Sequence, residues 1–512
     1  MPMHRVASLA DLRQDRGLQV EVGEKKIVLV RDGEEVRAYQ GECPHAGAPL
    51  ADGAVCNGHL ICPWHKAQFA VHDGRLCEPP ALNALTRYAT QVIDDQIHVE
   101  DQPVQAAPQT RADDDRCFVI IGAGAAGTAA ACALREKGFN GQLLLMDREE
   151  SPGYDRTALS KFVLAADMRP DETPPLREDA FYEDNHIERV QGEVMKLDVI
   201  NKRVTLADGR RFAYDAALIA TGGEPRGLPL TGADLPQVLT LRCRDDAKQI
   251  LTAAQPGRHI LIVGDSFIGL EAASALRKRG VKVTVIARHE TPFVKQLGER
   301  IGRAIRALHE QNGVLFRTHV EVSRFEADGE KRLKVAVLSN GERMQVDAAL
   351  IGIGVAPATQ FIDGIELEED GSLLVDAGMQ AGKDLWAAGD IATFPINAAP
   401  QRIEHWRLAQ QHARIAASNM LGGDLHYSDV PYFWTFHFGK RLDCLGHAED
   451  WDDILYLGEP ETFTFLALLC KQGVVRSVVG CEREREVALL AERMKQPLFR
   501  EEALMLIHQL GQ

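Results

Sequence analysis

Two short segments near the N-terminus each carry one cysteine and one histidine. Cys43-Pro-His45 comes first, and Cys62-Pro-Trp-His65 follows after an interval of sixteen residues. Two thiolates and two imidazoles can hold a [2Fe–2S] cluster in which the cysteines bind one iron and the histidines the other. Zinc is the alternative, because it also accepts two cysteines and two histidines, although zinc knuckles usually pair cysteine with cysteine. We therefore predict that Cys43, His45, Cys62 and His65 are metal ligands.

The residues around these segments resemble the ligand loops of Rieske ferredoxins. Gly47 and Pro63 suit tight loops. High-potential Rieske proteins carry a loop disulfide and hydroxyl groups at positions that are occupied here by Ala48, Trp64, Ala67 and Phe69. Fewer donors to the cluster sulfurs leave the reduced state less stabilised. The resemblance implies a one-electron carrier of low reduction potential.

Composition limits the classes of protein that remain. The chain has 512 residues, of which 45% are hydrophobic and 26% charged, so we expect a globular protein of several domains. No apolar run is long enough to span a membrane, and ten scattered cysteines indicate a reducing compartment, so we expect a cytoplasmic protein. The net charge of −16 argues against nucleic acid as a partner.

The N-terminal domain is expected to be small and all-β. Lys26–Val30 and Gln91–Val99 alternate like strands, and a stretch rich in proline, small residues and acids follows them. We assign residues 1–104 to this domain and residues 105–115 to a linker.

A first dinucleotide-binding unit begins after the linker. The apolar strand Cys117–Ile121 leads into a glycine-rich turn, a helix, and a second strand that ends in Asp147. In such a turn, the glycines allow the tight bend, the approach of a diphosphate, and the packing of helix on strand. The predicted contacts are Gly122, Gly124, Ala125, Ala126, Gly127 and, on the ribose, Asp147 with its neighbour Arg148.

A second unit of the same kind begins at His259–Val263. Its turn contains Gly264, Ser266 and Gly269. Ala287 stands at the end of its second strand, where NADH-binding units carry an acid, and Arg288 follows it. A guanidinium there can bind a 2′-phosphate, although Glu290 is close enough in sequence to reach the ribose. We favour NADPH or dual use over strict NADH.

Two later motifs resemble those of two-dinucleotide flavoproteins. These motifs are Ala220-Thr221-Gly222 and Gly389-Asp390. The resemblance places FAD in the first unit and NAD(P)H in the second, which is inserted between the two halves of the flavin domain. It implies α/β Rossmann-like domains for FAD (116–235 and 360–425) and for NAD(P)H (236–359), followed by an α+β C-terminal domain (426–512).

Further segments resemble bacterial ferredoxin reductases and, because of the fused Rieske segment, the apoptosis-inducing-factor-3-like family most of all. The resemblance adds Arg156, Ser160, Lys161, Glu271, Gly352, Gly354, Glu404, His405, Trp406 and Trp434 to the cofactor-binding residues. Lys161 and Glu271 are expected beside the flavin and nicotinamide rings as catalytic residues, with a solvent-facing role for Glu271 as the alternative.

The expected activity is transfer of electrons from NAD(P)H through FAD to the cluster and then to a redox protein. The segment Glu149–Leu164 lacks the C-x₄-C pair of disulfide reductases. The candidate acceptors are a cytochrome P450, an oxygenase component or a ferredoxin, and the candidate assemblies include a homodimer. The alternative is a redox-responsive NAD(P)H-binding signalling protein.

Overall fold

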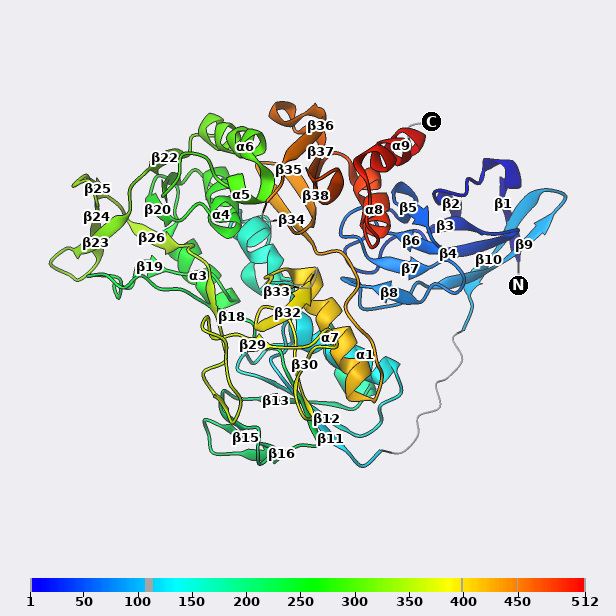
Figure 1. Cartoon of the computed structure of the whole chain (residues 1–512), viewed down its shortest axis with the longest axis horizontal. Helices are drawn as coiled ribbons and strands as arrows, with labels where there is room; N and C mark the ends of the chain where they lie inside the picture. Colours follow the sequence, from blue (N-terminus) through cyan, green and yellow to red (C-terminus); the bar gives the residue numbers. More distant parts are fainter. Residues whose placement is uncertain (1, 106–113, 397–398, 449, 511–512) are drawn as a thin grey trace.

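The N-terminal domain is built from two antiparallel sheets (Figure 1). A computed structural model of the chain describes residues 2–105, 114–396, 399–448 and 450–510. The larger sheet has the order β1-β10-β9-β4-β3-β2, with strands Met3–Ser8, Gln96–Pro103, Arg87–Ile93, Glu35–Gln40, Lys25–Asp32 and Leu18–Val22. The smaller sheet has the order β5-β6-β7-β8, with strands Ala54–Cys56, His59–Ile61, Gln68–Ala70 and Leu76–Glu78.

The prediction of one strand in this domain is wrong. Gln91–Val99 is a hairpin and not a single strand, because β9 ends at Ile93 and β10 begins at Gln96. Asp94 and Asp95 both have positive φ, at 48° and 60°, and reverse the chain. Aspartate tolerates this conformation better than most residues and is common in turns, so the Asp-Asp pair was the missed signal.

The first α/β domain has a six-stranded sheet of order β13-β12-β11-β17-β31-β30. Its strands are Ile187–Gln191, Gln142–Asp147, Cys117–Ile121, Ala216–Ile219, Leu385–Ala387 and Gln380–Gly382. Helix α1 (Ala125–Glu136) follows β11 and packs on α7 (Trp406–Met420). A Cβ atom on Gly127 would lie 1.7 Å from Gly122 O, so only glycine allows the helix to start this close to the strand.

The second α/β domain is inserted between β17 and β31 of the first. Its parallel sheet has the order β19-β26-β20-β21-β22, with strands Val238–Leu239, Ala348–Ile351, His259–Val263, Lys282–Ala287 and Leu315–Thr318. The helices of this domain are α3 (Arg244–Ala253), α4 (Phe267–Lys278), α5 (Val294–Leu297) and α6 (Glu299–Gln311). The chain enters and leaves the insertion through the antiparallel pair β18 (Gly223–Pro225) and β27 (Val355–Pro357).

Three small sheets and two short helices complete these α/β domains. The sheets are β16-β15-β14-β28 (Arg211–Ala213, Arg203–Leu206, Val194–Asp198, Ile362–Asp363), β23-β24-β25 (Val322–Ala327, Leu333–Leu338, Arg343–Gln345) and β29-β32-β33 (Leu373–Leu374, Ala392–Ile396, Ala399–Gln401). The helices are α2 (Asp179–Asp184) and the π-helical segment Leu159–Val163, which packs on α4.

The C-terminal domain lies between the N-terminal domain and the inserted domain (Figure 1). Its antiparallel sheet has the order β34-β35-β38-β37-β36, with strands Tyr432–His437, Lys440–Gly446, Val474–Cys481, Thr464–Lys471 and Asp453–Glu459. Helices α8 (Glu484–Arg493) and α9 (Arg500–Leu510) follow the sheet. Ala488 and Leu489 of α8 pack on Ala54 and Ile61, so this domain shares an apolar cluster with the N-terminal domain.

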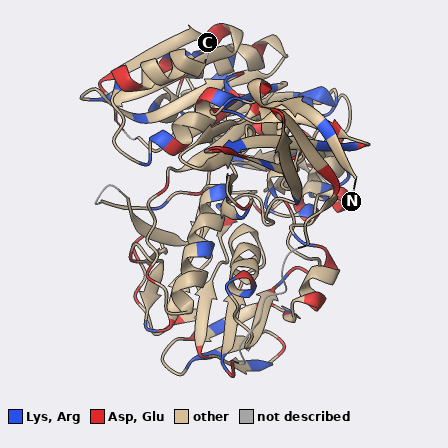
Figure 2. Ribbon diagram, turned by 90° about the vertical axis from the view of Figure 1, so that its right-hand side faces the viewer, with Lys and Arg blue, Asp and Glu red and all other residues tan. Residues whose placement is uncertain are grey.

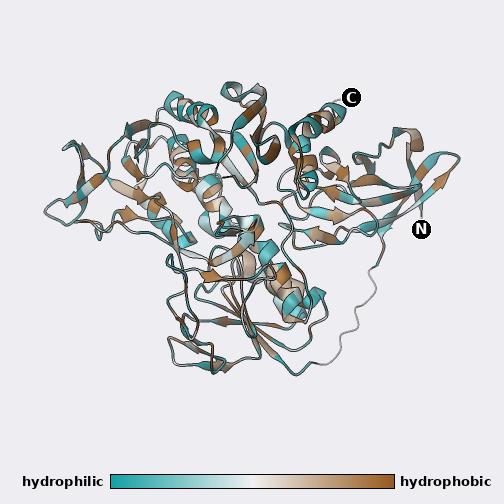
Figure 3. Ribbon diagram, in the orientation of Figure 1, coloured by the Kyte–Doolittle hydropathy of each residue, from teal (hydrophilic) through white to brown (hydrophobic). Residues whose placement is uncertain are grey.

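Hydrophobic and charged residues differ in where they lie on these elements. Hydrophobic residues gather on the strands and helices, whereas the connecting loops are largely hydrophilic (Figure 3). Acidic and basic residues are interspersed over the face shown in Figure 2. Among the described residues, no helix is both long enough and apolar enough to cross a membrane.

Candidate active site and cluster site

The four predicted metal ligands lie in two loops of similar construction. Cys43 and Cys62 are buried, with 2% and 1% of their surface exposed. Cys43 N donates to Ala48 O and Cys62 N donates to Ala67 O, each at 2.8 Å, so both loops close five residues after the cysteine. The predicted histidine ligands also meet, because His45 Nδ1 lies 3.0 Å from His65 Nδ1.

The protonation of these groups suits a metal cluster. Burial lowers the pKa of both His45 and His65, so their imidazoles are neutral and can donate a lone pair. Burial opposes ionisation of Cys62, but a hydrogen bond from Cys43 and the backbone N–H groups of Trp64 and His65 bring its pKa to about 7. Two adjacent cysteines, which bind metal as thiolates, and two neutral imidazoles are the donor set that a [2Fe–2S] cluster with mixed ligands requires.

A cavity of about 550 Å³ lies where the first α/β domain, the inserted domain and the C-terminal domain meet. The predicted cofactor-binding residues on its wall are Gly124, Ala125, Ala126, Arg156, Ser160, Lys161, Ala220, Thr221, Gly222, Glu271, Gly389, Asp390, Glu404, His405, Trp406 and Trp434. His405 Nδ1 and Trp406 Nε1 are buried without a hydrogen-bond partner among the described residues. The wall therefore presents polar atoms that a bound ligand can satisfy.

Two arginines lie on the cavity wall close to the start of α1. Arg156 and Arg242 line the cavity together with Gly124, the N-cap of α1. Burial and the neighbouring charge of Arg156 lower the pKa of Arg242, and Asp390 Oδ2 lies 3.9 Å away from its guanidinium. Two guanidiniums beside a helix N-terminus form a site for a diphosphate, which fits FAD. Sequence reasoning missed Arg242, whose only signal was an arginine before a helix that lies far from the glycine-rich turn.

Lys161 and Glu271 form a buried ion pair in this cavity. Lys161 Nζ lies 3.0 Å from Glu271 Oε2, and their side chains are 7% and 4% exposed. Ser160 Oγ donates to the same oxygen at 2.6 Å. Thr435 Oγ1 and Phe436 N donate to the other oxygen, at 2.8 and 3.4 Å. Glu271 is therefore not the solvent-facing acid of the alternative interpretation.

A row of hydrogen bonds extends from Glu271 into the protein. Thr435 has one hydroxyl proton and donates it to Glu271, so its oxygen accepts from His437 Nε2 at 3.0 Å. His437 Nδ1 is then an acceptor, to which His309 Nε2–H donates a hydrogen bond at 3.2 Å. Burial lowers the pKa of both imidazoles, that of His437 to about 3, so both are neutral. The hydrogen bonds of His309, His437 and Thr435 therefore all run in one direction, each donating toward the Glu271 carboxylate.

The other predicted cofactor-binding residues are not on the cavity wall. They are Gly122, Gly127, Asp147, Arg148, Gly264, Ser266, Gly269, Arg288, Gly352 and Gly354. Asp147 accepts from Ala123 N at 2.6 Å and from Glu149 N at 2.9 Å, so it fixes the glycine-rich turn. Arg148 pairs with Glu224 at 2.8 Å.

The glycine-rich turn of the second unit has the construction of the first. A Cβ atom on Gly264 would lie 2.4 Å from Gly352 O, and one on Gly269 would lie 2.6 Å from Gly264 O. Ser266 caps α4, because its Oγ accepts from Gly269 N at 3.2 Å. Gly354 has a φ of 96° and lies next to the exit strand β27.

At the end of β21, Ala287 is buried and Arg288 is largely exposed. The Arg288 guanidinium pairs with Glu321 at 2.6 Å. Glu290 accepts from Arg306 at 2.5 Å and from Thr318 at 2.9 Å, so its carboxylate is already bound by two side chains.

The cluster loop and the cavity meet at two aromatic rings. The His65 ring lies 4.3 Å from the Trp434 ring, centroid to centroid. Trp434 is also part of the cavity wall, and Lys161 Nζ lies 5.9 Å from its ring centroid. Trp434 therefore contacts the predicted cluster ligand His65 and also lines the cavity.

Comparisons with known proteins agree with this arrangement. The profile of the pyridine nucleotide-disulphide oxidoreductase family matches residues 117–413, and that of the Rieske [2Fe-2S] domain matches residues 3–89. The chain belongs to the pyridine nucleotide-disulphide oxidoreductase family and carries a Rieske domain at its N-terminal end. This Rieske-containing oxidoreductase uses FAD and NAD(P)H and holds a [2Fe–2S] cluster, as predicted, and the zinc alternative falls.

Several proteins are similar to this oxidoreductase over most of their length. Apoptosis-inducing factor 3 of Mus musculus is 34% identical over 507 residues, which cover 95% of this chain and 83% of that protein. The biphenyl dioxygenase system ferredoxin–NAD(+) reductase component of Paraburkholderia xenovorans (strain LB400) is 35% identical over 376 residues, covering 73% and 91%. The crystal structure of the ferredoxin reductase for the CYP199A2 system from Rhodopseudomonas palustris superposes with a TM-score of 0.71 at 25% identity, covering 76% and 97%. The predicted multidomain fold is confirmed.

Proposed function

We propose that this chain passes electrons from NAD(P)H through FAD to its own Rieske cluster and then to a separate redox protein. The observation that carries the proposal is the contact between His65 and Trp434 at 4.3 Å. This contact brings the predicted cluster loop to the wall of the flavin cavity, so the two centres need no diffusional encounter. When bound, FAD takes two electrons together, whereas the cluster takes one at a time.

The side chains of the cavity have distinct tasks in this proposal. Arg156 and Arg242 hold the diphosphate of FAD. Lys161 stands beside the ring system as a cation whose charge is balanced by Glu271, and Ser160 and Thr435 hold that carboxylate in place. The wall between cavity and cluster is Trp434, which excludes water from the gap between them.

The external acceptor is a cytochrome P450, an oxygenase component or a ferredoxin. Relatives that are named as ferredoxin reductases of a dioxygenase system and of a P450 system support this class. They do not favour the alternative of a signalling protein. None of the ten cysteines, all of which lie in the described part of the chain, forms a disulfide bond, which supports a cytoplasmic location. A homodimer stays a prediction that gel filtration with light scattering can check.

Anaerobic stopped-flow mixing with NADH and with NADPH tests the internal route, because the flavin and cluster absorption bands can be followed separately. We expect the cluster band to bleach after the flavin band in the same molecule, at a rate that does not depend on protein concentration. A Cys62→Ser variant should still reduce ferricyanide with NAD(P)H but lose most reduction of cytochrome c. Equal cytochrome c reduction by the variant and the native protein would contradict passage through the cluster.

A further inference from the structure

The second ligand loop carries a lysine at the position where the first carries glycine. Gly47 and Lys66 each lie four residues after the cysteine of their loop, and their φ angles are 74° and 60°. Open space surrounds the position of a Cβ on Gly47. A left-handed conformation is unfavourable for lysine, so the contacts of its side chain are of interest.

The Lys66 side chain is fully buried, with 0% of its surface exposed, and all three of its protons have acceptors. Nζ donates to Pro63 O in its own loop, to Asp443 Oδ2 at 2.9 Å on β35, and to Glu484 O at 3.4 Å at the start of α8. Asp443 is 3% exposed. An ammonium group buried in this way stays charged only because its partners replace the lost water.

A tyrosine of the C-terminal sheet joins the same contact. Tyr432 Oη on β34 lies 2.7 Å from Trp64 O and 2.9 Å from Asp443 Oδ1, and its proton is shared between these acceptors. The Tyr432 ring also lies 5.5 Å from Lys66 Nζ. The residues on both sides of His65 are therefore bound to β34 and β35.

We infer that Lys66 is a positioning residue: its buried ammonium ties the Cys62–His65 loop to Asp443 and thereby holds the His65 imidazole against Trp434. The contact between Lys66 and Asp443 does not depend on the proposed function. Its effect on electron transfer, however, rests on that function. The tie keeps the cluster loop at the flavin cavity, so electrons pass between centres that are already in contact. Neither residue touches the cluster or the flavin in this scheme.

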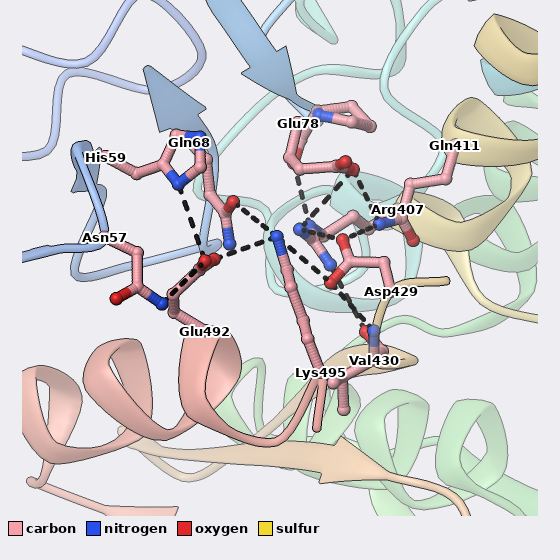
Figure 4. A network of polar contacts seen from close by, with 11 residues as sticks. Asn57, His59, Gln68, Glu78, Arg407, Gln411, Asp429, Val430, Glu492 and Lys495 are labelled. Atoms are coloured by element: carbon pink, nitrogen blue, oxygen red, sulfur yellow. Dashed lines mark hydrogen bonds and ion pairs between the residues drawn. The ribbon is translucent and has the colours of Figure 1, made fainter. Parts of the chain in front are cut away.

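Other contacts hold the two domains together away from the loop. Arg485 Nε of the C-terminal domain donates to Gly53 O at 3.2 Å. Arg407 Nε, on α7 of the first α/β domain, donates to Pro79 O at 2.8 Å and holds the N-terminal domain from another side. Glu492 and Lys495 add the network drawn in Figure 4. Loss of the Lys66 contact should therefore loosen the ligand loop without separating the domains.

Lys66→Gly is the most direct test, because glycine suits the left-handed backbone while the buried side chain and all its contacts are removed. Asp443→Asn weakens the tie from the other domain. Lys26→Met is the matched control, since Lys26 forms an exposed ion pair with Glu42 at 2.8 Å in the same domain. Each is compared with the native holoprotein by hydrogen exchange in the oxidised state without nucleotide, and by anaerobic stopped-flow. The electron paramagnetic resonance signal of the reduced cluster checks that the cluster is assembled.

We expect Lys66→Gly and Asp443→Asn to raise amide exchange at least tenfold in residues 62–67 and in β35, with the resonance signal retained. Cluster reduction should slow at least tenfold while flavin reduction keeps its rate, and Lys26→Met should match the native protein in both. Unchanged exchange in Lys66→Gly and Asp443→Asn would overturn the inference. If instead NAD(P)H fails to reduce the cluster of the native protein, the proposed function falls, and hydrogen exchange still decides the role of Lys66.

Discussion

Lys161 and Glu271 come from two different α/β domains and form a buried ion pair of 3.0 Å in the flavin cavity. Lys161 belongs to the π-helical segment of the first domain, and Glu271 to α4 of the inserted domain. The pair therefore ties the inserted domain to the first α/β domain at the wall of the cavity. Five hydrogen bonds of the carboxylate and ammonium groups are made within the protein, before any cofactor is bound. The groups are Ser160, Lys161, Thr435 and Phe436 around Glu271, and Thr157 O beside Lys161 Nζ.

Replacing Glu271 by glutamine should leave Lys161 as a buried cation without a counter-charge. Breaking a buried pair in this way costs about 3 kcal/mol or more, so the free energy of unfolding should fall by about that amount. Urea unfolding followed by FAD fluorescence measures it. Lys278→Met removes an exposed pair from the same helix and should change the value by less than about 0.5 kcal/mol. A Glu271→Gln protein as stable as the native one would show that the pair carries no such energy.

The direction of the hydrogen-bond row fixes the tautomers of two histidines. His437 and His309 should both carry their proton on Nε2 and should stay neutral from pH 8 down to about pH 5, because burial lowers the pKa of both. Nitrogen NMR of histidine-labelled protein can distinguish the tautomers. Thr435→Val should change the His437 signal, since it removes the acceptor of the Nε2 proton. An Nδ1 proton on His437 would contradict the assignment.

His65→Cys should remove the cluster or lower its reduction potential, because a thiolate adds negative charge where a neutral imidazole stood. The FAD spectrum should persist, since the flavin cavity is formed by other domains. Electron paramagnetic resonance of the dithionite-reduced protein measures the cluster. His72→Cys, at an exposed histidine of the same domain, is the control and should keep the native signal. An unchanged signal in His65→Cys would disprove the ligand assignment.

Arg288→Ala should lower kcat/KM for NADPH about tenfold and leave that for NADH nearly unchanged. Buried Ala287 supplies no acid for the ribose, and Glu290 is bound by Arg306 and Thr318. Among the residues that the structure describes, Arg288 is paired only with the exposed Glu321, and it can turn to a 2′-phosphate. Steady-state kinetics with both nucleotides gives the ratio. A strong NADH preference that the substitution leaves intact would exclude this role of Arg288.

The free energy of unfolding should decrease as the pH rises from 5 to 7, because of Glu78 at the domain interface. Burial and the charge of Asp429 raise the pKa of Glu78 to about 7, against the opposing effects of Arg407, Gln411 and Lys495. The folded state therefore holds a proton that the unfolded chain loses above about pH 4.3, so stability declines as the pH rises toward 7.

Glu78→Gln mimics the protonated acid and should remove this decline, which amounts to at most about 4 kcal/mol. Gln411 Nε2, which lies 2.8 Å from Glu78, can still donate to the amide oxygen. Melting temperatures at pH 5, 6, 7 and 8 compare the variant with the native protein. The two curves should separate as the pH rises, and parallel curves would rule out a raised pKa at Glu78.

Local patterns in the sequence predicted the chemistry of this protein well. The Cys-His pairs indicated a cluster, and the two glycine-rich turns indicated two dinucleotides, because ligand loops and βα turns depend on residues that lie within a few positions of one another. Gly127 is an example of such a local constraint. A Cβ atom at this position would collide with the carbonyl oxygen of Gly122, only five residues earlier. The hairpin at Asp94 and Asp95 was not predicted, because the apolar–polar alternation continues on both sides of the turn and suggests a single strand.

The relations between domains were decided only by tertiary structure. Lys66 meets Asp443 across 377 positions of the chain, and His65 meets Trp434 across a similar interval. Arg242 reaches the flavin cavity because the inserted domain folds back onto the first. No local spacing encodes such pairs, since they depend on how separate cores pack on one another. The sequence by itself thus determined which cofactors the chain binds, whereas the packing of its domains decided which side chains stand between them.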